Sequence, residues 1–195
     1  MKKFVGLFTL LVVVTISAQE NEMDVPYASI PDAPTEYTAF TVTSRMIDGL
    51  GFRFYWATEG LTEANLLYRV NEDGRTISET IEHVYNLSMI ILNSSKKLPT
   101  DFTVDLVKPS TSEMRAVILK NLKEASELIK ASTDLSEHSI VFKNKKGTRE
   151  LPFWNQINGP IEDAVWHSGQ IVLMRRAAGN PFNSKASVLT GTVRD

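Results

Sequence analysis

Two separate stretches of the sequence contain three side chains that can bind a metal ion. Asp163 and His167 stand four residues apart in the stretch GPIEDAVWHSGQIVLMRRAAGNP, so one helical turn brings them to the same face. His83 lies in another partly apolar stretch, TISETIEHVYNLS. Two imidazoles and one carboxylate make an open three-ligand site, suited to Zn²⁺ or Fe²⁺ with water or a substrate completing the shell.

A helical projection of each stretch places these three residues at the edge of a buried face. Apolar side chains form one stripe in each helix, and charged side chains occupy the opposite side. His83, Asp163 and His167 fall on the same flank of their stripes, so they converge if the two helices are neighbours. They could instead hydrogen-bond to one another as a metal-free polar cluster, and spacing alone leaves both interpretations open.

Two further polar residues lie beside the candidate ligands. Glu79 precedes His83 by one helical turn and is a candidate supporting residue or an alternative ligand. Gln170 lies next to the ligand face of the later helix, where its amide could orient Asp163 or a bound water. Both could also be ordinary solvated side chains.

The other residues with chemical potential are expected to have mainly structural roles. Trp56 and Trp154 are interpreted as core residues, whereas Trp166 falls outside the apolar stripe and is the best candidate for a pocket or an interface. His138 is interpreted as a surface loop residue. Arg175 points along the apolar stripe, which suggests that it pairs with a buried carboxylate.

Capping signals and apolar periodicity predict an all-α fold, a four-helix bundle with a long connection between the third and fourth helices. The first helix is expected over residues 42–59, although Gly49 and Gly51 weaken it. The later helices are expected over residues 76–95, 110–132 and 152–178. Pro160 should kink the last of them, and HSIVFK in the long connection could form a short strand.

Residues 1–18 have the pattern of a cleavable secretory signal. Two lysines precede the apolar run FVGLFTLLVVV, and Ala18 stands at a typical cleavage position. The run lacks the ~20 apolar residues that a permanent membrane anchor needs. We therefore expect a periplasmic or secreted protein that has no membrane attachment after cleavage. An extended lead-in of residues 19–41 would precede a helical domain of residues 42–195.

The composition excludes several kinds of chemistry. The 195-residue chain has no cysteine, which rules out disulfides, zinc–thiolate sites, iron–sulfur clusters and cysteine nucleophiles. Any metal must therefore be held by His, Asp or Glu. The formal net charge of −2 is not an electrostatic footprint for nucleic acid or anionic lipid.

Three stretches together resemble the DinB-like (DinB/YfiT) family of four-helix-bundle, metal-dependent proteins: RFYWATEGL, TISETIEHVYNLS and WNQINGPIEDAVWHSGQIVLMRRAAGNP. The resemblance implies a divalent metal held by a histidine of the second helix and two positions of the fourth, here His83, Asp163 and His167. The family most often has three histidines, so Asp163 is a departure from its pattern. A carboxylate is a harder ligand than imidazole, and Zn²⁺, Ni²⁺, Fe²⁺ and Mn²⁺ all stay open.

The resemblance also implies a choice of activities and partners. Relatives include thiol transferases and isomerases that use low-molecular-weight thiols, and bundles of this family often pair as homodimers. A metal-bound water would support hydrolysis instead, so we expect either a hydrolase or a thiol transferase acting on a small molecule. The alternative is a non-catalytic binding or structural bundle, in which a polar cluster or a metal only stiffens the helices.

Overall fold

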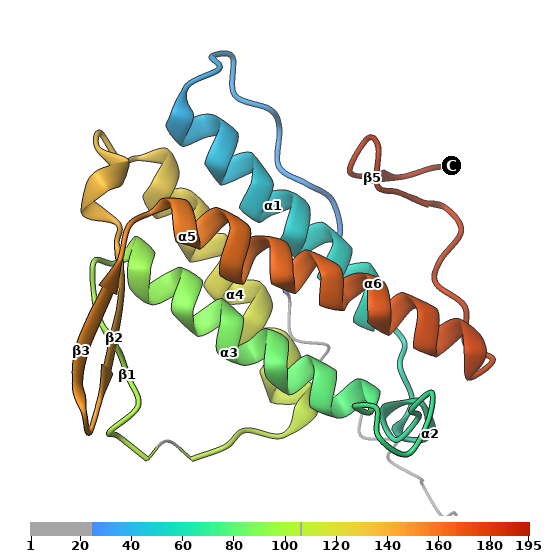
Figure 1. Ribbon diagram of the computed structural model, residues 1–195. Helices are drawn as coiled ribbons and strands as arrows, with labels where there is room; N and C mark the ends of the chain where they lie inside the picture. The colour runs from blue at the N-terminus through green and yellow to red at the C-terminus, as the bar shows by residue number, and fades with distance from the viewer. Residues whose placement is uncertain (1–24, 106) are drawn as a thin grey trace, which may run out of the picture.

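The computed structural model describes residues 25–105 and 107–195, and these residues are mostly helical (Figure 1). The predicted secretory signal, residues 1–18, lies outside the described residues. Four long helices dominate the fold: α1 (Ala39–Thr58), α3 (Ile77–Ser95), α4 (Thr111–Lys130) and α6 (Glu162–Ala177). Among the described residues, no helix has the length and apolar character required to cross a membrane.

The apolar faces of the four long helices enclose one core. Helices α1 and α3 each pack against both α4 and α6. Fully buried side chains from all four helices meet there, including Phe54, Ile81, Ile118 and Ile171. Because α3 and α6 are direct neighbours, residues on their facing flanks can approach each other.

The capping signals of the sequence position the helix starts. Helix α3 begins after Thr76, whose backbone and side chain form a capping box with Glu79, and Ser110 opens α4 in the same way. Helix α1 begins at Ala39, earlier than predicted, because Thr38 and Thr41 form a capping box that was not anticipated. The lead-in therefore ends at Thr38.

The connection between α4 and α6 is a β-hairpin rather than a plain loop. Strand β2 (Ile140–Asn144), which contains most of the HSIVFK stretch, pairs antiparallel with β3 (Gly147–Leu151). Strand β1 (Thr100–Asp101) adds to β2 in parallel, and a short 3₁₀ turn (Leu135–Glu137) precedes the hairpin. The possible strand in HSIVFK is thus confirmed, while an all-α description omits this small sheet.

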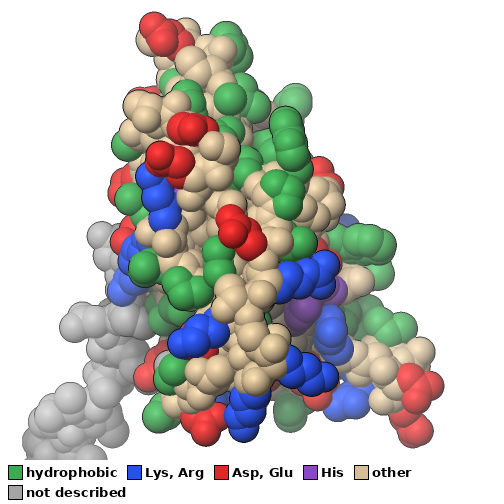
Figure 2. All heavy atoms as spheres, turned by 60° about the vertical axis from the view of Figure 1, so that its left-hand side comes forward, with side chains coloured by type: hydrophobic (Ala, Val, Ile, Leu, Met, Phe, Trp, Pro, Cys, Tyr) green, Lys and Arg blue, Asp and Glu red, His purple; other side chains and the backbone are tan. Residues whose placement is uncertain are grey.

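Smaller elements complete the chain. Helix α2 (Glu63–Leu66) lies in the connection between α1 and α3, and β4 (Ala186–Ser187) pairs with β5 (Thr192–Val193) near the C-terminus. Figure 2 turns the left-hand side of Figure 1 toward the viewer. On this face several Lys and Arg side chains gather in the lower half, and mainly acidic and hydrophobic side chains lie above them.

Tyr27 of the lead-in packs onto α1. Tyr27 is 3% exposed, and its hydroxyl donates a hydrogen bond of 2.9 Å to Oδ1 of Asp48. Burial, together with the negative charge of Asp48, raises the pKa of Tyr27 well above its ordinary value. The ring lies directly over Gly51, where an added Cβ would come within 2.4 Å of it. Gly51, which weakened the helix prediction, therefore provides the space that the Tyr27 ring occupies.

Substituting Gly51 with alanine should destabilise the protein, although alanine is the better helix former. The new methyl group would displace the Tyr27 ring and break its bond to Asp48, at a cost of about 2–3 kcal/mol that outweighs the ~1 kcal/mol of helix propensity. Urea unfolding measures the difference. Gly169→Ala is the matched control, because nothing lies within 4 Å of its added Cβ. Equal stabilisation by both substitutions would contradict the role given to Gly51.

Candidate metal centre

A kinked helical segment directly precedes α6, the helix that carries Asp163 and His167. The short helix α5 (Trp154–Gln156) continues into a π-helical turn, η2 (Ile157–Ile161). Within that turn Gly159 leaves the helical region, with φ −96° and ψ −109°, and Pro160 has no N–H to donate. The kink predicted at Pro160 is confirmed, and it divides the helix predicted over residues 152–178 into α5, η2 and α6. Asp163 consequently lies in the first turn of α6.

The structure brings His83, Asp163 and His167 together. Asp163 lies between the two imidazoles: its Oδ2 is 3.3 Å from Nε2 of His83, and its Oδ1 is 3.3 Å from Nε2 of His167. The two rings are nearly perpendicular, at 86°, with centroids 4.5 Å apart. One ligand atom from each residue lies within 4.8 Å of the others, so the group could hold a metal ion.

The separations between donor atoms can be compared with those of a shared ion and with those of direct hydrogen bonds. Two ligands of one tetrahedral ion, each about 2.05 Å from it, lie roughly 3.3–3.4 Å apart. An N–H···O hydrogen bond is most often about 2.9–3.0 Å long. Both distances from Asp163 to the histidines are 3.3 Å and start from different carboxylate oxygens, so they fit an ion held by both oxygens or a long hydrogen bond to each histidine.

Gln170 fixes the orientation and the tautomer of His167. Its Oε1 lies 2.7 Å from Nδ1 of His167, and because an amide oxygen can only accept, the imidazole donates from Nδ1. In neutral His167 the lone pair then sits on Nε2 and faces the Asp163 carboxylate, which is also an acceptor. Two acceptors in contact require a proton or a cation between them. Gln170 was expected to orient Asp163 or a water, and it orients His167 instead.

The group is accessible from solvent. The side chain of Asp163 is 38% exposed, that of His83 is 30% exposed and that of His167 is 12% exposed. A cavity of about 410 Å³ opens beside it, and both His167 and Gln170 line this cavity. A small molecule could therefore approach the group from the side of His167.

Sequence reasoning missed the opposite wall of this cavity. It is formed by the connection before α3, which contributes Val70, Gly74 and Arg75. The connection has no periodic pattern, so its side chains could not be placed on a face. One sequence signal could have placed Arg75 near the site. It immediately precedes Thr76, the N-cap of α3, and α3 carries His83.

Glu79 does not belong to the group. Its carboxylate accepts hydrogen bonds from the backbone N–H and the hydroxyl of Thr76. These bonds hold the pKa of Glu79 below its ordinary value, and the bond from the backbone N–H has the larger effect. Since the carboxylate is engaged in capping α3, the prediction that it supports or replaces a ligand is not met here.

Several other predicted roles are corrected by the structure. Trp154 is 76% exposed rather than in the core, whereas Phe153 and Gln156 of the same segment are buried. Trp166 is 72% exposed, as its place outside the apolar stripe indicated, but it does not line the cavity beside His167. His138 is only 3% exposed, and its Nε2 lies 2.8 Å from Oγ of Ser132. The prediction of a surface position for His138 is wrong, since the hairpin folds it against α3.

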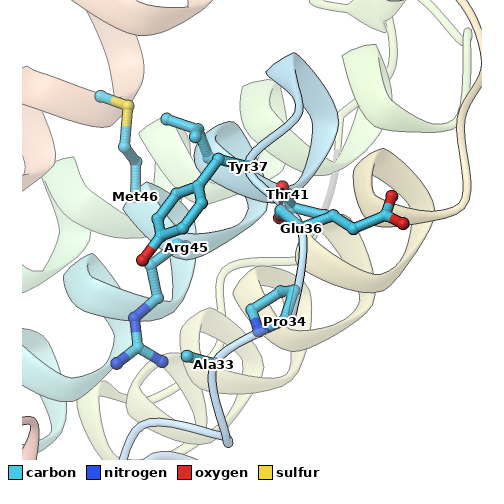
Figure 3. Close-up of a pocket in the computed structure, with 8 residues that line it drawn as sticks. Ala33, Pro34, Glu36, Tyr37, Thr41, Arg45 and Met46 are labelled. Atoms are coloured by element: carbon cyan, nitrogen blue, oxygen red, sulfur yellow. Dashed lines mark hydrogen bonds between the residues drawn. The ribbon is translucent and has the colours of Figure 1, made fainter.

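A second cavity, of about 390 Å³, lies where the lead-in meets α1 (Figure 3). Its lining includes Tyr37, Arg45 and Glu36 but no histidine. The guanidinium of Arg45 donates to the carbonyl of Pro31, and the carboxylate of Glu36 points away from it (Figure 3). The described part of the chain therefore places no group of metal ligands in this cavity.

The chain matches no family model, no curated protein and no solved structure. The resemblance to the DinB-like family is thus carried only by the three sequence stretches and remains a prediction. The properties of the candidate centre rest on the contacts of His83, Asp163 and His167 themselves.

Proposed function

We propose that His83, Asp163 and His167 hold a divalent metal ion, and that the protein is a metal-dependent enzyme acting on a small molecule. The observation that carries this proposal is the pairing of two acceptors, Nε2 of His167 and Oδ1 of Asp163, at 3.3 Å. A cation between them removes the repulsion that a neutral imidazole and a carboxylate would otherwise experience. His83 supplies the third donor from α3.

The residues of the chain have separable roles in this proposal. Asp163 gives the site one negative charge, Gln170 holds the His167 ring by its Nδ1, and His167 forms the border between the ligand group and the cavity. A divalent ion bound there would supply a lowered pKa for a coordinated water or thiol. The partial exposure of all three ligands leaves space for such a molecule.

Two reactions follow from the same arrangement. Attack by water would make the protein a hydrolase, and attack by a low-molecular-weight thiol would make it a thiol transferase. Membership of the DinB-like family, the four-helix-bundle architecture and export to the periplasm or the exterior belong to the same proposal. The packing of four long helices supports the bundle architecture, and the origin of the ligands on α3 and α6 fits the family pattern, whereas export rests on the sequence of residues 1–18.

Metal analysis of protein prepared without a histidine tag tests the proposal. We expect about one divalent ion per chain, or stoichiometric uptake of Co²⁺ by metal-free protein. Absence of both would leave a metal-free polar cluster. If Co²⁺ binds, addition of azide or 2-mercaptoethanol should change its visible spectrum, because an open site exchanges ligands. A spectrum that neither molecule alters would indicate a closed, structural site and contradict the enzymatic role.

A further inference from the structure

Arg75 is an unpaired cation in the wall of the cavity beside His167. Among the described residues its guanidinium has no hydrogen bond and no ion pair within 4 Å, and its charge acts at longer range on Glu79. The Glu79 carboxylate is engaged by Thr76, which also satisfies the start of α3. The charge of Arg75 is therefore available to a bound molecule.

Within residues 25–105 and 107–195, no acidic side chain lines this cavity. Its lining has a polar part, in which Arg75 faces the same space as His167 and Gln170, and an apolar part made of Val70, Leu173 and Met174. Val70 is 67% exposed and Leu173 is 63% exposed, so apolar area stays open to solvent here. A guanidinium beside uncovered apolar surface is suited to a molecule with an anionic group and an apolar portion.

We propose that Arg75 determines specificity by binding a carboxylate, phosphate or sulfonate group of the small-molecule substrate. The apolar portion of that molecule covers Leu173 and Val70, and its reactive atom is directed toward His167 and the ligand group. This inference rests on the proposed function for the reaction that the substrate undergoes. The binding of an anionic group by Arg75 can be tested separately from that reaction. The formal net charge of the chain is −2, so an anion is drawn to this cavity by a local cation and not by the protein as a whole.

Two probes of similar shape and different charge test the inference by binding alone. Phenylacetate and 2-phenylethanol are titrated into ¹⁵N-labelled protein, and dissociation constants are taken from amide shifts. We expect phenylacetate to bind about tenfold more tightly than 2-phenylethanol, with shifts at residues that line the cavity. Arg75→Gln should remove this difference by weakening phenylacetate and leaving 2-phenylethanol unchanged. Arg176→Gln, an exposed arginine outside the cavity lining, is the matched control and should change neither value.

The outcomes separate this inference from the proposed function. Equal affinity for the two probes, or an unchanged preference in Arg75→Gln, would overturn the role of Arg75 even in a protein that binds Co²⁺. A preference that is lost in His83→Ala but kept in Arg75→Gln would show that the carboxylate binds the metal and would also overturn it. A preference that depends on Arg75 in a protein that takes up no metal would uphold the inference while the proposed metal chemistry fails.

Discussion

Replacing His83 with alanine should abolish stoichiometric binding of a divalent ion. The substitution removes the only ligand that α3 contributes, and leaves Asp163 and His167 on a single helix turn. Residues that merely support metal ligands change affinity by about 10–100-fold, so loss of a ligand should weaken binding by more than about 100-fold. Calorimetric titration with Co²⁺ or Zn²⁺ gives the dissociation constants.

Thermal unfolding provides a second measurement of the same effect. At a free metal concentration of 100 times its dissociation constant, bound metal stabilises the folded state by about 2.7 kcal/mol. Wild-type protein should gain this stability and His83→Ala should not. Asn86→Ala, at an exposed position of α3, is the control and should behave as wild type. Full metal occupancy in His83→Ala would show that the ion, if present, is held elsewhere.

Replacing Arg175 with methionine should cause the largest loss of stability without touching the candidate centre. Arg175 is 3% exposed, and its Nη1 donates to the carbonyls of Trp56 and Ala57 at 3.0 Å each. Its Nε and Nη2 donate to the carbonyl and side-chain oxygens of Asn180. One guanidinium thus joins the C-terminal ends of α1 and α6, where the helix dipoles favour a cation.

The expected cost of Arg175→Met is about 3 kcal/mol, because methionine fills much of the volume but leaves buried carbonyls without their charged donor. In a chain of this size, that loss lowers the melting temperature by about 6–12 °C. Differential scanning calorimetry measures it, with Arg176→Met as the exposed control, for which a change within about 0.5 kcal/mol is expected. A loss no greater than that of the control would mean that the carbonyls find other partners.

The starts of α3 and α4 and the buried faces of the helices could be predicted from the sequence. Side-chain caps are local, so Thr76 with Glu79 and Ser110 with Glu113 could be recognised from four residues each. The edge positions of His83 and Asp163 followed from the period of the α-helix, and α3 and α6 do pack against each other. What periodicity could not provide was the contact itself, since neighbouring helices had to be assumed.

Interactions with backbone groups and with irregular segments could not be predicted from the sequence. Arg175 was expected to meet a carboxylate, but most of its partners are backbone carbonyl oxygens, which every residue offers and no pattern marks. The ring of Tyr27 over Gly51 joins an irregular segment to a helix, and the cavity wall with Arg75 comes from a connection without a period. His138 was misplaced for the same reason, because its burial depends on how the hairpin folds back.

The two parts of the candidate centre are 80 residues apart in the chain, and this separation sets an order of events. A polypeptide emerging N-terminus first presents His83 long before Asp163 and His167, and the later pair arrives with the last long helix. During synthesis, and during any threading through a translocation channel, the chain therefore holds one ligand of three. Metal loading would have to follow closure of α6 against α3, so an occupied centre would report that these two helices have packed together.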